Sequence, residues 1–282
     1  MTPPLAIAAA TPRGASRDTV AFRRLRELIQ QQSGIELPGN KEALLAARLA
    51  SRMRALGLIS YHDYLAHVTA DPGGEELVHL LDAVTTNVTS FYREPVHYRL
   101  LERQARRWVA AGASRLRLWS AACASGEEPY TLGMVLAETL GYGVDWRILA
   151  TDLSTRALRR AQEGCYSASR LTALPATLRQ RYFQPAPSNG PRQWQVVPAL
   201  RERVAFRRLN LASPPFPLRG GLDVVFCRNV MIYFDQATRR KLIDELVRLL
   251  KSDGLLCVGH AESLAGLTGS LTPLEPSAYA RS

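Results

Sequence analysis

The chain has 282 residues, of which 46% are hydrophobic and 22% charged, with 19 glycines and 17 prolines. This composition excludes a disordered, collagen-like or disulfide-stapled chain, and the length suits one large domain or two smaller ones. An excess of 36 Lys and Arg over 25 Asp and Glu gives a net charge of +11, which indicates an acidic partner such as nucleic acid, an anionic membrane or an acidic protein. A genomic base composition that favours Arg codons would also explain the overall bias.

The positive charge is concentrated in one stretch. Residues 156–208 contain 11 basic and two acidic residues, a net of +9, whereas residues 111–155 contain three basic and five acidic residues, a net of −2. The basic stretch is therefore expected to face the acidic partner.

The sequence shows no pattern typical of a membrane span, a secretory signal, a disulfide framework or a metal site. No run approaches the roughly 20 apolar residues of a membrane span, and the N-terminus lacks the basic region of a secretory signal. The four cysteines show no CxxC spacing and the five histidines no ligand spacing. We therefore expect a cytoplasmic protein with no membrane insertion, no disulfide framework and no metal.

Apolar spacing in the first 86 residues is typical of a small helical bundle. A flexible tail is expected over residues 1–15, and a helical domain over residues 16–86. Within this domain the pattern predicts helices over 16–33, 40–57, 61–70 and 75–84.

The second of these helices carries a basic face. At 100° per residue, Lys41, Arg48 and Arg52 fall beside its apolar stripe. The face is either a solvated flank or a docking surface for an acidic partner.

A polar stretch over residues 85–93 and a longer helix to about residue 111 connect the bundle to a second region. We expect this linker and connecting helix to cover residues 87–113.

After residue 114 strands alternate with helices, which predicts a parallel α/β sheet with sites at the carboxyl ends of its strands. We expect this domain to cover residues 114–282. Residues 165–203 break the alternation with prolines and a short extended piece, and therefore predict an inserted subdomain. The expected strands cover 116–120, 146–152, 204–208, 222–228 and 255–259, and the expected helices 128–140, 154–163 and 235–251.

A loop of small residues, 121–126, follows the first of these strands and precedes Glu127. Small side chains let a ligand approach the backbone, although a tight strand-to-helix turn would look the same. Asp152 ends the next strand, where an acid commonly binds ribose hydroxyls. An acid in the loop disfavours phosphate, so a ligand with a ribose and a cationic group fits better than a dinucleotide. S-adenosylmethionine has both.

The most specific motif ends the strand over residues 222–228. An apolar strand delivers Arg228 and Asn229 at its carboxyl end, and Tyr233 and Phe234 follow in a turn that leads into a helix. Simple polar capping of a strand end would not explain this grouping of Arg, Asn, Tyr and Phe.

From about residue 17 to about residue 280, the sequence resembles the chemotaxis receptor glutamate O-methyltransferases of the CheR type. The resemblance implies a class I S-adenosylmethionine-dependent methyltransferase domain with a Rossmann-like, mostly parallel sheet. It also implies an all-α N-terminal domain and a small inserted antiparallel β-subdomain. The implied reaction is the methylation of receptor glutamates, which yields methyl esters and S-adenosylhomocysteine during chemotaxis adaptation. Four segments carry the resemblance: TTNVTSFYR (85–93), WSAACASGEEPY (119–130), ILATD (148–152) and FCRNVMIYFD (226–235).

The resemblance also implies roles for individual residues. Arg93 and Tyr233 are expected at the catalytic mouth, with Arg93 near the methyl acceptor. Lys41, Arg48 and Arg52 become candidates for docking the receptor. The expected cofactor contacts are Asn87, Thr89, Arg93, Glu127, Asp152, Asn210, Leu211, Arg228 and Asn229.

Two other functions and one uncertain partner stay open at this level. Ser213–Phe216 superficially matches a signature of nucleic-acid amino-methyltransferases, but it precedes the strand that such a motif should end and is interpreted as a loop. A non-catalytic receptor-binding module would be expected to lose cofactor ligands, and none is lost. The inserted subdomain is a candidate site for a receptor C-terminal peptide by strand addition. Its turn over residues 187–191 lacks a Gly-x-Gly, which favours an enzyme that needs no such tether.

Overall fold

The structure is a computed structural model, and it describes residues 13–37, 42–187, 193–264 and 269–282. Most of the expected tail, the turn at 188–191 and Lys41 therefore lie outside the described residues. The chain forms two compact units, which are residues 1–32 with 37–84 and residues 33–36 with 85–282.

Within its described residues, the first unit consists of four helices with buried apolar faces. Leu25 and Ile29 of α1, Leu49 of α2, Tyr64 of α3 and Leu80 of α4 have no exposed surface. The i, i+4 spacing of Leu25 and Ile29 is the one that predicted the first helix. The bounds are α1 (Arg13–Ser33), α2 (Glu42–Ala55), α3 (Tyr61–Ala70) and α4 (Glu75–Val84).

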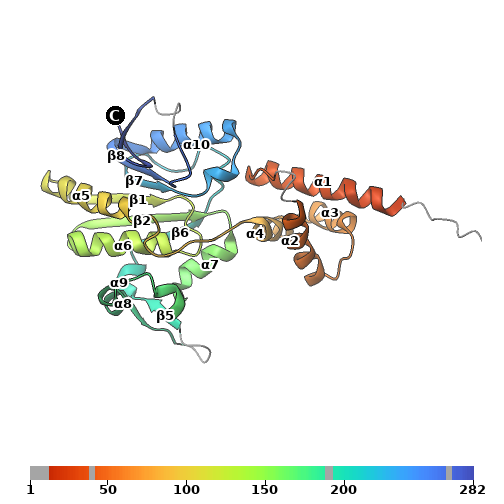
Figure 1. Cartoon of the computed structure of the whole chain (residues 1–282), viewed down its shortest axis with the longest axis horizontal. Helices are drawn as coiled ribbons and strands as arrows, with labels where there is room; N and C mark the ends of the chain where they lie inside the picture. Colours follow the sequence, from red (N-terminus) through yellow and green to blue (C-terminus); the bar gives the residue numbers. More distant parts are fainter. Residues whose placement is uncertain (1–12, 38–41, 188–192, 265–268) are drawn as a thin grey trace, which may run out of the picture. The chain divides into compact units, whose positions relative to one another are not determined.

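The second unit is built on a seven-stranded sheet with the order β6-β2-β1-β7-β8-β10-β9 (Figure 1). The first five strands in this order run parallel, and β10 and β9 are antiparallel. This arrangement confirms the expected mostly parallel sheet. The strands are β1 (Arg115–Ser120), β2 (Asp145–Asp152), β6 (Val204–Arg208), β7 (Leu222–Cys227), β8 (Leu250–Val258), β9 (Leu271–Glu275) and β10 (Ala278–Arg281). The helices are α5 (Val96–Ala110), α6 (Glu127–Leu140), α7 (Thr155–Glu163), α10 (Gln236–Leu249) and the short η3 (Met231–Tyr233).

Both faces of the parallel sheet are buried. Along β7, Val224 and Phe226 belong to the apolar cluster that includes α5 and α6, whereas Val225 and Cys227 belong to the cluster that includes α10. This alternation follows from the period of two in a strand and explains why the strands read as continuous apolar runs.

The insertion after α7 is a small antiparallel sheet with the order β3-β5-β4, which confirms the expected β-subdomain. Its elements are β3 (Cys165–Ser167), η2 (Ala168–Leu171), α8 (Ala176–Tyr182), β4 (Phe183–Pro185), β5 (Gln193–Val196) and α9 (Pro198–Arg201).

Two details differ from the sequence prediction. The hairpin of β9 and β10 was not predicted, because its strands are short and β9 contains Pro273 with mostly exposed side chains. The helix expected to reach Lys251 ends at Leu249, since Leu250 already pairs with Leu222 in the sheet. Among the described helices, none combines the length and the apolar character that a bilayer span requires.

Candidate active site

The loop between β1 and α6 lies at the carboxyl edge of the sheet and is closely packed from behind. Ala124 and Gly126 have positive φ angles of 46° and 95°. A Cβ on Gly126 would lie 2.9 Å from both the Ala161 Cβ and the Tyr166 hydroxyl, so only glycine fits there. The Tyr166 hydroxyl also donates to the carbonyl of Ser125 at 2.7 Å. The insertion therefore fixes the shape of this loop.

Asp152 ends β2, the strand that neighbours β1, and binds the same loop. Its Oδ2 accepts the backbone N–H of Ala124 at 2.8 Å, and its Oδ1 accepts that of Ser154 at 2.9 Å. Both carboxylate oxygens of Asp152 therefore hold backbone N–H groups at the end of β2. The structure thus brings the expected acid and the expected loop together.

Glu127 and Glu128 are adjacent and both buried, but they face different partners. Glu127 accepts from the Ser125 hydroxyl at 2.7 Å and from Arg170 of the insertion at 3.1 Å. Glu128 accepts from the Ser120 hydroxyl at 2.7 Å and pairs with Arg228 at 3.0 Å. Burial raises the pKa of each carboxyl group, and the positive partners only partly oppose it.

Arg228 is a buried residue that connects several segments at this edge of the sheet, with 4% of its surface exposed. Its guanidinium pairs with Glu128 at 3.0 Å and with Glu94 at 2.9 Å, and it donates to the Arg93 carbonyl at 2.5 Å. Burial disfavours its charge, yet Glu128 and Glu94 hold its pKa above the ordinary value. The geometry gives Arg228 a positioning role. The direct cofactor contact expected from the sequence stays a prediction.

The turn that contains Arg93 is strained on both sides. Tyr92 and Glu94 have positive φ angles of 53° and 56°, which non-glycine residues rarely adopt. Arg93 Nη1 donates to the Val88 carbonyl at 3.0 Å. Arg228 holds the turn through the Arg93 carbonyl and the Glu94 carboxylate, so the strain is stabilised by a buried ion pair.

The segment before this turn carries two further expected cofactor contacts. Asn87 and Thr89 are both half-buried. The carbonyl of Thr89 accepts from Arg170 at 3.3 Å, so this arginine of the insertion bridges the segment and Glu127.

The turn after β7 is held by a carboxylate that the sequence analysis missed. Glu262 is 1% exposed, and it accepts the backbone N–H groups of Asn229 at 2.7 Å, Met231 at 2.7 Å and Gly259 at 2.6 Å. Asn229 itself has a positive φ of 58°. One buried side chain therefore ties the ends of β7 and β8 together.

The segments after β6 and β7 meet the short stretch between α1 and α2. The N–H of Glu36 donates to the Tyr233 carbonyl at 2.7 Å, and a Cβ on Gly34 would lie 2.4 Å from that of Ala212. Asn210 closes its own turn by accepting the Ala212 N–H at 3.0 Å. Leu211 is a buried core residue.

The motif Ser213–Phe216 occupies the loop between β6 and β7. Phe216 is buried, and its ring packs edge-to-face on Trp119 with centroids 5.6 Å apart. This placement confirms the interpretation of the motif as a loop.

Two of the expected docking residues, Arg48 and Arg52, are engaged within the first unit. Arg52 pairs through Nε with the buried Glu76 at 2.9 Å, and the Tyr64 hydroxyl donates to the same carboxylate at 2.9 Å. Arg48 donates to the carbonyl of Val84. Arg52 therefore stabilises the helical unit, and its docking role stays a prediction.

Sequence reasoning missed Glu94, Glu128, Arg170 and Glu262. The sequence could have indicated three of these residues as candidates for the site. Glu128 adjoins the chosen Glu127, and Glu262 follows the last parallel strand. Glu94 adjoins the chosen Arg93. Nothing in the sequence indicated Arg170, since it lies 43 residues from its partner Glu127 in a region of irregular pattern.

Comparisons with known proteins agree over both units. Residues 21–85 match the model described as CheR methyltransferase, all-alpha domain, and residues 87–279 match CheR methyltransferase, SAM binding domain. The chain is 40% identical over 243 residues to chemotaxis protein methyltransferase 2 of Pseudomonas aeruginosa, covering 86% of each chain. It is 39% identical over 264 residues to the chemotaxis protein methyltransferase of Escherichia coli, covering 93% of this chain and 90% of that one. The corresponding Borreliella burgdorferi protein is 35% identical over 264 residues, or 91% of this chain and 92% of that one. The chain therefore belongs to the CheR family of S-adenosylmethionine-dependent chemotaxis methyltransferases.

Proposed function

We propose that this chain transfers the methyl group of S-adenosylmethionine to glutamate carboxylates on cytoplasmic helices of chemoreceptors. The products are glutamyl methyl esters and S-adenosylhomocysteine. The carrying observation is the convergence of Asp152, the loop at Ala124–Gly126 and the Arg93 turn on one edge of the sheet. The names of the relatives, chemotaxis protein methyltransferases, support the same reaction.

The residues present fit S-adenosylmethionine. The Ala124–Gly126 loop consists of small residues that let a ligand approach its backbone, and Asp152 ends the strand where an acid commonly binds ribose hydroxyls. Asn87, Thr89, Asn210 and Asn229 would add polar contacts, and Glu127 a negative charge for the cationic end. Leu211 contributes through the core, and Arg228 by positioning the Arg93 turn.

The reaction needs positioning more than proton transfer. When bound, S-adenosylmethionine supplies a methyl group activated by a sulfonium. A glutamate carboxylate has an unperturbed pKa near 4.3 and is therefore already ionised at neutral pH, so no general base is required. Arg93 orients and partly desolvates this carboxylate through a charge-assisted hydrogen bond, and Tyr233 shares the positioning so that the nucleophile is not held too tightly.

Charge on the second unit supports an acidic partner. Arg159 and Arg160 of α7, with Arg208 of β6, are exposed, and α7 packs against β6. Among the described residues, none of these three arginines forms an ion pair. We name them the α7–β6 arginine face. It lies next to Asp152, which is opposite Arg208 in the sheet register.

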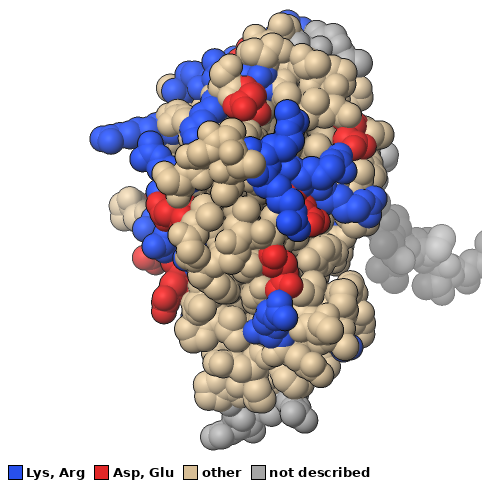
Figure 2. All heavy atoms as spheres, turned by 90° about the vertical axis from the view of Figure 1, so that its left-hand side faces the viewer, with Lys and Arg blue, Asp and Glu red and all other residues tan. Residues whose placement is uncertain are grey.

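A different surface provides a control. On the side that carries α5, basic and acidic groups are interspersed (Figure 2). Within α5, Arg106 pairs with Glu102 at 2.8 Å, and Arg107 donates to Gln104. Arg106 and Arg107 form the α5 control pair.

The receptor peptide at the β-subdomain stays a proposal. A cavity of about 230 Å³ on this subdomain is lined by Leu171, Arg179 and Trp194, which suits an apolar and acidic peptide. A pull-down with receptor C-terminal peptides would test it.

The test of the proposed function is incubation with radiolabelled S-adenosylmethionine and receptor cytoplasmic fragments. Base-labile label on glutamate is the expected result. Arg93→Ala should lower kcat strongly while S-adenosylhomocysteine affinity measured by calorimetry falls less. Base-stable label on nucleic acid would contradict the assignment, and full turnover by Arg93→Ala would remove Arg93 from the mechanism.

A further inference from the structure

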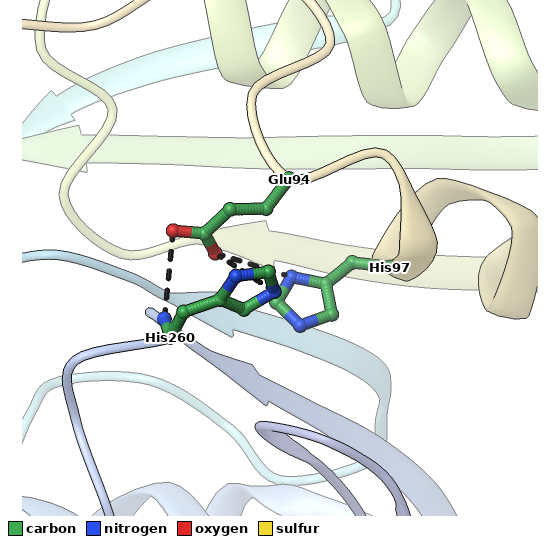
Figure 3. Close-up of side chains that lie close together, drawn as sticks. All are labelled: Glu94, His97 and His260. Carbon is green, nitrogen blue, oxygen red and sulfur yellow. Dashed lines mark hydrogen bonds and ion pairs between the residues drawn. The ribbon is translucent and has the colours of Figure 1, made fainter.

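One carboxylate and two imidazoles form a cluster beside the Arg93 turn, and the proposed reaction gives none of them a contact with the substrate or the cofactor. Glu94 and His97 flank the start of α5, and His260 follows β8 (Figure 3). Glu94 Oε2 lies 3.7 Å from His97 Nδ1 and 3.9 Å from His260 Nε2. One ligand atom from each residue lies within 4.8 Å of the others.

His97 is the most informative member of the cluster. It has no exposed surface, and within the described part of the chain neither ring nitrogen has a hydrogen bond of normal geometry, with only the backbone of Pro276 close by. Its ring packs edge-to-face on Phe226 and on His260, with centroids 6.0 and 5.4 Å away. A buried polar group without a partner costs about 1–3 kcal/mol, so native proteins rarely keep one without a role.

Charged groups of both signs lie beside the cluster. The guanidinium of Arg228 pairs with both Glu94 and Glu128.

The carboxylate is also held in place. Arg228 pairs with Glu94 Oε2 at 2.9 Å, and the His260 N–H donates to Glu94 Oε1 at 3.4 Å. Such outer hydrogen bonds to a ligating carboxylate are typical of metal sites.

We propose that Glu94, His97 and His260 bind one divalent cation of the zinc class. Two imidazole nitrogens and one carboxylate oxygen match the preference of Zn²⁺, with a fourth position toward solvent. Tetrahedral bonds of about 2.0–2.1 Å place ligand atoms about 3.3 Å apart. The distances of 3.7 and 3.9 Å therefore shorten by about half an ångström on binding, and the third pair of ligand atoms, which lies within 4.8 Å, by up to about 1.5 Å. The His260 side chain, which is 51% exposed, is free to make this movement and gives the cation access.

The experiment is a calorimetric titration of the untagged full chain with Zn²⁺, with a parallel optical titration with Co²⁺. We expect one cation per chain. His260→Ala removes an exposed ligand, so it should leave the melting temperature of the metal-free protein unchanged and weaken Zn²⁺ binding at least tenfold. Glu94→Gln should weaken it similarly.

His67→Ala is the matched control. His67 is an exposed imidazole of the first unit, 4.0 Å from the carboxylate of Glu76, and its loss should leave Zn²⁺ affinity unchanged. The proposal is overturned if the wild-type chain binds no Zn²⁺, or if His260→Ala binds it equally well. A thiolate-to-cobalt charge-transfer band would assign binding to cysteine and overturn it as well.

Discussion

Glu262 is the buried carboxylate that holds the turn after β7, and the substitution Glu262→Gln tests this role. The side chain accepts three backbone N–H groups at 2.6–2.7 Å, from Asn229, Met231 and Gly259. Glutamine keeps the size of the side chain but removes its charge. It also replaces one acceptor oxygen with an amide group that donates.

The magnitude follows from the geometry. The amide oxygen can take the place of Oε2, which accepts two of the N–H groups, so both bonds survive without charge assistance and weaken by about 0.5–1 kcal/mol each. The amide NH₂ then faces the N–H of Met231, which is left without an acceptor at a cost of about 1–3 kcal/mol. We expect a total loss of about 2–5 kcal/mol in unfolding free energy. Because Asn229 sits in this turn, S-adenosylhomocysteine affinity should fall at least tenfold, or about 1.4 kcal/mol.

The assay combines urea denaturation with calorimetric titration of S-adenosylhomocysteine. Glu163→Gln is the control, since it removes the same charge from an exposed carboxylate of α7 and should change neither quantity. If Glu262→Gln matches the wild-type chain in both stability and affinity, the carboxylate does not hold the turn.

Three further predictions concern other parts of the chain. Gly34→Ala and Gly57→Ala both place a side chain at a φ of +71°, but only at Gly34 would the new Cβ meet a neighbouring atom. Urea denaturation should therefore show a loss of unfolding free energy of about 1 kcal/mol for Gly57→Ala and at least 2 kcal/mol more for Gly34→Ala. Equal losses for the two variants would contradict this. Burial works to raise the pKa of Glu76, but Arg52 and the Tyr64 hydroxyl lower it below the unfolded value, so the carboxylate stabilises the fold above about pH 4.5 and less as the pH falls through its folded pKa. Glu76→Gln should therefore have a lower melting temperature than the wild-type chain at pH 7, and this difference in melting temperature should become smaller in acid. A difference that does not depend on pH would contradict a lowered pKa of Glu76. Reversing the charge of Arg159 and Arg160 should lower kcat/KM for the receptor about tenfold at low salt and by a smaller factor at high salt. The affinity for S-adenosylhomocysteine should not change. Reversing the charges of the α5 control pair should have little effect on kcat/KM. An equal effect of both pairs would remove the α7–β6 arginine face from docking.

The sequence by itself determined the type of fold and the edge that carries the site. Apolar periodicity is a local property, so the parallel strands and the helices between them could be read from neighbouring residues. Asp152 and Asn229 were found because parallel strands present their carboxyl ends at one edge, which makes the end of each strand informative. The four motif segments then identified the family, which the comparisons confirmed.

Only the tertiary structure decided which charged groups pair. Glu127 and Glu128 are adjacent in sequence, yet only Glu128 reaches Arg228, 100 residues away, because successive residues of a helix point about 100° apart. Arg52 looked exposed beside an apolar stripe but is bound to Glu76, which reaches it from another helix. Such pairs depend on which distant segments meet, and no local pattern records that. The net charge of +11 therefore indicated an acidic partner, whereas the fold decided which arginines remain exposed to meet it.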